Sequence, residues 1–320
     1  MAIPGWTQTE SPFHAGELAI QTRMGVQERM NAQGRRAIRD FMPDQHRQFF
    51  AQLPYVIVGT VDPLGSPWAS ILVGEVGFLS SPNDRTLQVR AKPLYGDPLA
   101  NILSQSIDIG ILGIELHTRR RNRMNGIVTA THKDCFEVLV RQSFGNCNKY
   151  IQARMFTLVD VELATPRLVH QFTTLDQAGQ VTIAAADTLF IASAYQGESA
   201  GAASGVDVSH RGGNPGFVRV DDDRTFTLPD FAGNCLFNTF GNLEVNPRAG
   251  LLFVDFEKGD LLYLTGTAEV IWQGDEIATF PGAERLLRFH LHRGHRVEKS
   301  LPLRWSGPEI SPVLLQETFQ

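Results

Sequence analysis

The residues best suited to ligand chemistry gather in two short stretches, of which the first spans 209–218. It combines a hydroxyl, an imidazole and a guanidinium with glycines at positions 212, 213 and 216. Glycine lets a backbone approach a flat or phosphorylated ligand closely, because no side chain stands in the way. The alternative is an ordinary hairpin turn whose arginine points into water. The candidates in this stretch are Ser209, His210, Arg211, Gly212, Phe217 and Val218.

The second stretch, 228–243, is rich in asparagine and leads toward an apolar run at 250–253. Asn and Thr at a helix start satisfy free backbone amides, and the same position can also hold a phosphate. We therefore predict a helix start near Asn238 and Thr239 with either a structural or a phosphate-binding role. The other candidates here are Pro229, Asp230 and Asn234.

Three segments nearer the N-terminus could contribute from a distance. The arginine run 119–123 falls in a predicted hairpin and is interpreted as a solvated turn, because runs of charge usually face water. The segment 146–152, which contains Lys149, could instead reach a ligand across the fold. His14 could do the same, although the simpler interpretation is an ordinary residue at a helix start.

Metal binding and nucleophilic catalysis are not indicated. His290 and His292 share a face of a predicted strand, and His295 follows, but no Asp, Glu or Cys beside the pair completes a ligand set. Cys147 has no histidine nearby in the sequence to activate it. We therefore expect no metal and assign no catalytic residue.

Length and composition fit a chain of two domains. Its 320 residues, 42% of them hydrophobic, are enough for two cores. A net charge of −5, from 34 acidic and 29 basic residues, argues against nucleic acid or membrane as a partner. Three cysteines without CxxC spacing are typical of a reducing compartment, and we find neither a signal-peptide pattern nor a bilayer-spanning run. We expect a cytoplasmic protein.

The regular elements change character near residue 53. Residues 11–53 show helical spacing, and Pro43 followed by Asp44 predicts a helix start. Beyond residue 53 the chain consists of short apolar runs separated by turn-forming clusters. This pattern predicts a mainly β fold with flanking helices, of the sandwich or barrel type. The clearest runs in the first half are 55–58, 69–73, 86–89 and 109–114.

The β pattern occurs twice along the chain. Three motifs return at nearly one offset, which is too long for a solenoid repeat and suits a whole domain. The pairs are 83–87 with 222–226 at an offset of 139, and 110–112 with 250–252 and 125–127 with 265–267 at an offset of 140.

The duplication predicts the domain organisation. We expect an N-terminal helical arm at 1–52, a first, degenerate barrel at 53–165 and a second, ligand-binding barrel at 166–320. If the single-copy ancestor was a symmetric dimer, the two copies pack against each other as a pseudo-dimer. A homodimer of the whole chain remains open.

Residues 217–270 resemble the core of the pyridoxamine 5'-phosphate oxidase-like flavin-binding split barrels. In that family a strand leads into a short helix, then to Asn-Pro-Arg-Ala with an apolar strand, and then to a hairpin that closes on a glycine. Through the repeat, the resemblance extends over roughly residues 53–300. It implies two tandem FMN-binding split β-barrels with FMN as the cofactor. The matching motifs are Leu-Pro-Asp at 228–230, Asn-Thr at 238–239, Asn-Pro-Arg-Ala at 246–249 and Thr-Gly-Thr at 265–267.

The resemblance also implies where the FMN phosphate lies. The family holds it after the strand that ends in Leu-Pro-Asp, usually with an Arg-Lys pair at the helix start. The aligned residues here, Asn238 and Thr239, donate hydrogen bonds but carry no charge, so Arg211 is the expected positive partner. The first copy lacks the Ser-His-Arg-Gly-Gly element and has Asp97 near the equivalent position, where a carboxylate repels phosphate. We therefore expect one flavin per chain.

The remaining roles follow from the same resemblance. Ser209 and His210 are expected at the ribityl chain or ring edge, and Pro229 and Asp230 supply backbone beside the isoalloxazine. The implied function is an FMN-dependent oxidoreductase that passes hydride or electrons to or from a small redox molecule. The alternatives are a protein that sequesters flavin without turnover, and a pocket for haem or a deazaflavin.

Overall fold

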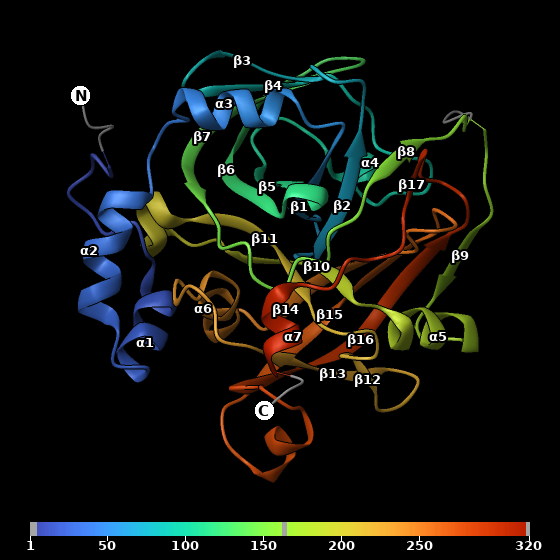
Figure 1. The fold of residues 1–320 in the computed structure, drawn as a ribbon. Coiled ribbons are helices and arrows are strands. Elements are labelled where there is room, and N and C mark those ends of the chain that lie inside the picture. Colours follow the sequence, from blue (N-terminus) through green and yellow to red (C-terminus); the bar gives the residue numbers. More distant parts are fainter. Residues whose placement is uncertain (1–4, 162–164, 318–320) are drawn as a thin grey trace.

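The computed structural model describes residues 5–161 and 165–317. Figure 1 shows two β units stacked on each other, the first in blue to green and the second mainly in yellow to red. Helices α1 and α2 of the N-terminal arm lie at one side, where α1 packs against α6 of the second unit, whereas α3 lies across the first unit beside β3. The arm consists of α1 (Ala15–Arg23), α2 (Gln27–Ala37) and α3 (Asp44–Ala51).

Local sequence explains how two of these helices begin. The His14 imidazole accepts a hydrogen bond from the Gly16 amide, and the Glu17 carboxylate accepts one from the His14 amide. This reciprocal pair is a capping box, so the helix-start interpretation of His14 is confirmed. The predicted start of α3 at Asp44, directly after Pro43, is also confirmed.

Seven antiparallel strands form the first sheet in the order β2-β1-β5-β6-β7-β4-β3. A short helix, α4 (Leu99–Ile102), connects β4 to β5. The strands are β1 (Tyr55–Val61), β2 (Pro67–Val73), β3 (Leu79–Asn83), β4 (Thr86–Val89), β5 (Asp108–Glu115), β6 (Arg120–Thr131) and β7 (Phe136–Gly145).

The second sheet has the order β11-β10-β14-β15-β16-β13-β12, and β9 (Val169–Phe172) also pairs with β16. Helix α5 (Gln177–Ala185) precedes it, and α6 (Asn238–Val245) connects β13 to β14. The strands are β10 (Thr188–Tyr195), β11 (Gly205–Gly212), β12 (Arg219–Val220), β13 (Thr225–Asp230), β14 (Arg248–Val254), β15 (Leu261–Ile271) and β16 (Arg285–Val297).

The two sheets have one topology, because the strands of the first follow the same order as those of the second. The equivalent hairpins, β6 with β7 and β15 with β16, even share an irregularity in register, before Gly126 and before Gly266. A Cβ atom at Gly126 would lie 2.2 Å from the Leu139 carbonyl oxygen, and one at Gly266 would lie 1.9 Å from that of His290. Only glycine fits at either bulge. The structure therefore confirms two tandem split β-barrels, and the 140-residue offset marks equivalent positions.

Each barrel has its own apolar core, and a third cluster lies between them. Along β1, Val56 and Val58 point into the first core, while Tyr55 and Ile57 point into the shared cluster. The equivalent strand β10 divides its residues in the same way between the second core and the shared cluster. Strands that are buried on both faces have near-continuous apolar sequences.

Reciprocal contacts relate the two barrels as a pseudo-dimer. A Cβ atom at Gly110 in β5 would lie 2.5 Å from the Val206 carbonyl oxygen in β11. A Cβ atom at the equivalent Gly250 in β14 would lie 2.2 Å from the Pro67 carbonyl oxygen in β2. At each of these equivalent glycines, the backbone of the other barrel approaches too closely for a side chain. Such a reciprocal contact is typical of an interface with two-fold symmetry.

The remaining elements join the two halves. Strand β8 (Phe156–Leu158) pairs with β17 (Leu303–Trp305), and α7 (Pro312–Glu317) follows. The domain boundaries near residues 52 and 165 stay a prediction, and residues 1–4, 162–164 and 318–320 lie outside the described parts. Within those parts, the helices are too short or too polar to cross a bilayer.

Candidate functional site

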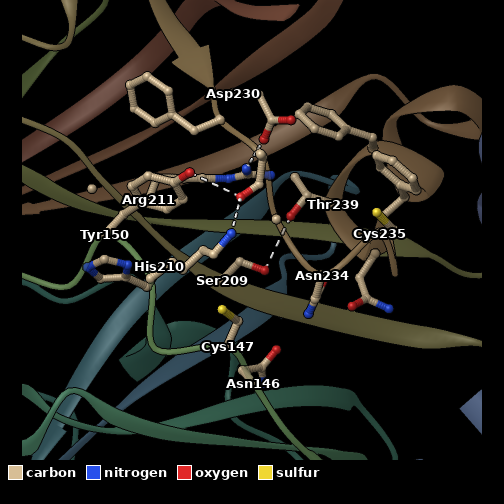
Figure 2. A pocket seen from close by; sticks show the side chains of 18 of the residues that line it. Asn146, Cys147, Tyr150, Ser209, His210, Arg211, Asp230, Asn234, Cys235 and Thr239 are labelled. Atoms are coloured by element: carbon tan, nitrogen blue, oxygen red, sulfur yellow. Dashed lines mark hydrogen bonds and ion pairs between the residues drawn. The ribbon is translucent and has the colours of Figure 1, made fainter. Parts of the chain in front are cut away.

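A cavity of about 1070 Å³, counting its open mouth, lies between the two barrels. We call it the inter-barrel cavity (Figure 2). The second barrel supplies β11, the end of β13 and the start of α6, and the first supplies β6 and the segment 146–150.

Strand β11 presents alternate residues to the cavity. Ser209 and Arg211 share the cavity face because strand side chains alternate. The ring of His210 points the other way and packs edge-on against Phe190, with 5.8 Å between ring centroids. Burial, assisted by the positive charge of Arg121, holds the pKa of His210 well below its ordinary value. His210 is therefore neutral, and its backbone rather than its ring borders the cavity.

Arg211 is held by a carboxylate at the end of β13. Its Nη1 donates to Asp230 Oδ1, and Nε of Arg285 donates to the other oxygen, Asp230 Oδ2, at 2.7 Å. Asp230 and Arg285 are buried, whereas 21% of the Arg211 side chain is exposed. The Arg211 guanidinium also lies 4.9 Å from the centre of the Phe240 ring. Arg285 also donates to Glu284, so this cluster contains two arginines and two carboxylates.

The first turn of α6 forms the floor beside Arg211. The residue before the helix, Phe237, has a φ of 61° and provides no side-chain cap, so free amides of the first turn border the cavity. Thr239 Oγ1 donates to Ser209 Oγ at 3.2 Å (Figure 2). Cys235 and Tyr150, also with positive φ, line the same cavity. Such unfavourable backbone conformations concentrate at ligand-binding sites.

The first barrel contributes Arg123, which is 3% exposed. Its Nη1 donates to Asp207 Oδ1 at 2.9 Å and its Nη2 donates to Ser209 Oγ. Asp207 also accepts from Asn125 and Asn242, both at 2.8 Å. Asp207 thus accepts three hydrogen bonds. The Ser209 hydroxyl accepts two, from Arg123 and Thr239, and keeps its own proton for a ligand.

The interpretation of the arginine run as a solvated turn is wrong for two of its members. Arg121 and Arg123 both line the cavity, because they are alternate residues on the inward face of β6. Arg121 Nε donates to the Cys147 carbonyl oxygen at 2.5 Å, and its Nη1 lies 3.5 Å from that of His210. Residues two apart in a strand share one face, so the spacing of Arg121 and Arg123 could have indicated a common site. The neighbouring arginines in the run made this spacing hard to recognise.

The segment after β7 forms one lip of the cavity. The ring of Tyr150 stacks on Phe231 at 5.1 Å, and its hydroxyl donates to the Ala232 carbonyl oxygen at 3.0 Å. Lys149 Nζ lies 3.5 Å from the same oxygen. These contacts bridge the first barrel to the loop after β13.

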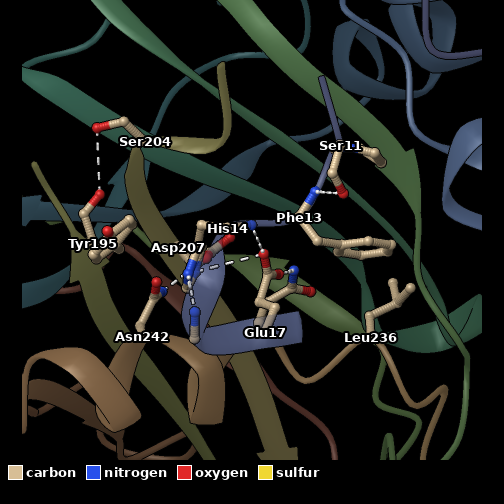
Figure 3. Close-up of polar contacts among 12 residues, drawn as sticks. Ser11, Phe13, His14, Glu17, Tyr195, Ser204, Asp207, Leu236 and Asn242 are labelled. Atoms are coloured by element: carbon tan, nitrogen blue, oxygen red, sulfur yellow. Dashed lines mark hydrogen bonds and ion pairs between the residues drawn. The ribbon is translucent and has the colours of Figure 1, made fainter. Parts of the chain in front are cut away.

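The N-terminal arm supports the α6 floor from behind (Figure 3). Asn238 donates from its side chain to the Glu17 carboxylate, so its amide nitrogen faces the arm rather than the cavity. Burial, reinforced by the charge of Asp207, raises the pKa of Glu17 to about 8. A protonated Glu17 at neutral pH lets this buried cluster hold one carboxylate charge instead of two.

The structure brings most of the predicted site residues together. Phe217 and Val218 lie elsewhere, buried in the core of the second barrel, and we leave them out of the site. Arg285, Arg123 and Arg121 were missing from the predicted site. The predicted residues that line the cavity are Lys149, Ser209, His210, Arg211, Gly212, Pro229, Asp230, Asn234, Asn238 and Thr239.

The equivalent place in the other half is filled by side chains. The strand register gives the equivalent residues of the two halves. Ser70 is equivalent to Ser209, Leu261 to Arg121 and Tyr263 to Arg123. Leu261 and Tyr263 are fully buried in the shared apolar cluster. Tyr263 and Ser70 both donate to Asp97, at 3.2 and 2.6 Å. The two halves have diverged, and the open cavity belongs to the half built on β11 and α6.

Comparison with known proteins gives distant likenesses. No protein-family model and no curated protein matches the chain. Similar solved structures include an FMN-binding protein from Syntrophomonas wolfei (14% identity, 38% of this chain, 84% of that one, TM-score 0.27). An FAD-binding protein from Mesorhizobium loti gives 12% identity, coverage of 41% and 98%, and a TM-score of 0.28.

A third likeness is a protein of the pyridoxinephosphate oxidase family from Clostridium acetobutylicum. It shows 16% identity, covers 37% of this chain and 83% of its own, and has a TM-score of 0.25. Each of these three structures covers less than half of this chain. These likenesses are too distant to support a chemical assignment, which depends on the residues of this chain.

Proposed function

We propose that the inter-barrel cavity binds flavin mononucleotide and that the protein is an FMN-dependent oxidoreductase. The observation that carries the proposal is the convergence of Arg211, Ser209 and Thr239 on the uncapped start of α6. Free helix amides, hydroxyl donors and a guanidinium together make a phosphate site.

The donor set fits a phosphate group. Arg123 Nε and Arg211 Nε are buried without a hydrogen-bond partner among the described residues. Five cationic side chains line the cavity, and three of them are paired with Asp207, Asp230 and Glu284. A phosphate group can accept from the unpaired Nε groups of Arg123 and Arg211 while these arginines keep their carboxylate partners.

The opposite wall suits the rest of a flavin. Tyr150 and Phe231 form a stacked aromatic pair at the lip, and the neutral side chain of Asn146 lines the same cavity. When bound, the flavin supplies hydride or electron transfer, and the protein supplies binding, orientation and electrostatics. Together with the sequence resemblance, this favours a flavin nucleotide over other phosphorylated ligands.

Ligand analysis tests the proposal directly. Protein purified with its ligand should show a flavin absorbance spectrum, and mass spectrometry after denaturation should release FMN rather than FAD, a deazaflavin or haem. Reduction of the bound flavin by NADH or NADPH separates an enzyme from a protein that only sequesters flavin. Failure of FMN, FAD and riboflavin to bind the ligand-free protein would refute the proposal.

A further inference from the structure

We propose that Arg121 and Lys149 of the first barrel form a second anion-binding subsite, which holds a carboxylate or phosphate group of the redox substrate. The proposal rests on the proposed function, because it takes the Ser209 end of the cavity as the place of the flavin phosphate. It assigns the substrate to a chemical class, small anions, and gives the first barrel its part in the site.

The first argument concerns the pairing of charges. Of the five cationic side chains on the cavity, Arg123, Arg211 and Arg285 are held by carboxylates of the second barrel. Within residues 5–161 and 165–317, Arg121 and Lys149 have no carboxylate partner. The cavity therefore contains three cations that the protein's own carboxylates neutralise. The other two, Arg121 and Lys149, can pair with a ligand.

The second argument concerns what Arg121 contacts. Its Nε and Nη1 meet neutral carbonyl oxygens, of Cys147 and His210, and no described residue accepts from Nη2. Burial lowers the pKa of Arg121 to about 10, so the group stays charged at neutral pH. Arg121 is half-buried, and a charge that is partly removed from water without a counter-ion is destabilising, so an anion that enters the cavity relieves that cost.

Lys149 completes the subsite from the same segment. It lies two positions after Cys147, whose carbonyl oxygen accepts a hydrogen bond from Arg121. Its ammonium group lies 3.5 Å from the Ala232 carbonyl oxygen, which is a long and weak hydrogen bond. The group is therefore free to turn toward an anion at the lip.

The third argument separates this subsite from the phosphate end. Arg121 precedes Arg123 by two residues on one face of β6, which places the two roughly 7 Å apart along the strand. Arg123 is bound to Ser209 at the floor, whereas Arg121 is bound to Cys147 at the lip. One phosphate group at the floor therefore leaves the lip cation unpaired.

The fourth argument comes from the duplication. The position of Arg121 is occupied in the second barrel by Leu261, which is fully buried in the shared cluster. The hairpin therefore forms without a cation at this place. The copy that borders the open cavity has arginine at this position, and the copy whose equivalent place is filled has leucine. This difference indicates a role for the arginine in ligand binding.

The test measures anion binding to FMN-loaded protein. We would titrate inorganic phosphate, and benzoate against the neutral benzamide, into wild type, Arg121→Gln and Lys149→Gln by calorimetry. We expect wild type to bind the anions and to prefer benzoate, and each substitution to weaken anion binding by about tenfold. Arg120→Gln is the matched control, because Arg120 also lacks a described carboxylate partner but lies over Phe49, away from the cavity.

The outcomes separate this proposal from the flavin proposal. Absence of anion binding, or anion binding that Arg121→Gln leaves unchanged, overturns the subsite. A second result also overturns it. If Arg121→Gln loses the preference for FMN over riboflavin while Arg211→Gln keeps it, the flavin phosphate lies at the lip and occupies the proposed subsite. If wild type binds no flavin, the proposed function fails alone, since Arg121-dependent phosphate binding is measurable in flavin-free protein. Unchanged FMN affinity in Arg121→Gln shows that the variant is folded.

Discussion

Arg211 provides the sharpest test of the phosphate end. In Arg211→Gln the ligand phosphate loses a charge-assisted hydrogen bond, worth about 1.5 to 3 kcal/mol. At about 1.4 kcal/mol for each factor of ten, FMN affinity should fall by roughly tenfold to a hundredfold. Riboflavin has no phosphate, so its affinity should change much less. Fluorescence titration of both flavins with wild type and variant gives the four dissociation constants.

The ion pair with Asp230 adds a second arm to this experiment. Without Arg211, one Asp230 oxygen loses its partner, and its charge then repels the phosphate beside it. Asp230→Asn in the Arg211→Gln background should therefore restore part of the lost FMN affinity. Arg219→Gln is the control, because Arg219 pairs with Asp221 and Glu276 outside the cavity. Equal losses for FMN and riboflavin, or no loss for either, would refute the role of Arg211.

Three further predictions concern stability and assembly. Burial raises the pKa of Glu17 from 4.5 to about 8, so between these pH values the folded protein keeps a proton that the unfolded chain releases. The free energy of unfolding should therefore fall as the pH rises from 4.5 to about 8. Urea unfolding across that range should show a smaller fall in Glu17→Gln; an equal fall would contradict the assignment. Gly250→Ala places a methyl group 2.2 Å from the Pro67 carbonyl oxygen and should cost about 1 to 3 kcal/mol in denaturant unfolding, whereas Gly307→Ala, in open space, should cost little. Residues 1–165 alone expose their half of the shared apolar cluster and should self-associate in gel filtration, so a well-behaved monomer would contradict the pseudo-dimer.

Sequence alone determined the features that depend on local pattern. The duplication was visible because equivalent strands and bulges require the same residue types at the same spacing, as Gly126 and Gly266 show. The start of α3 at Asp44 followed from the proline directly before it. Helix α6 begins at the predicted Asn238, although no side chain caps it. Such signals act over a few positions, so a single sequence displays them.

Only the tertiary structure decided which groups meet across the two barrels. Arg123 is bound by Asp207, 84 positions away, and Asp230 is shared between Arg211 and Arg285, which no local spacing indicates. For the same reason the arginine run could not be assigned to cavity or solvent from its composition. Strand periodicity fixes which residues share a face, but the partner of that face depends on how the sheets pack.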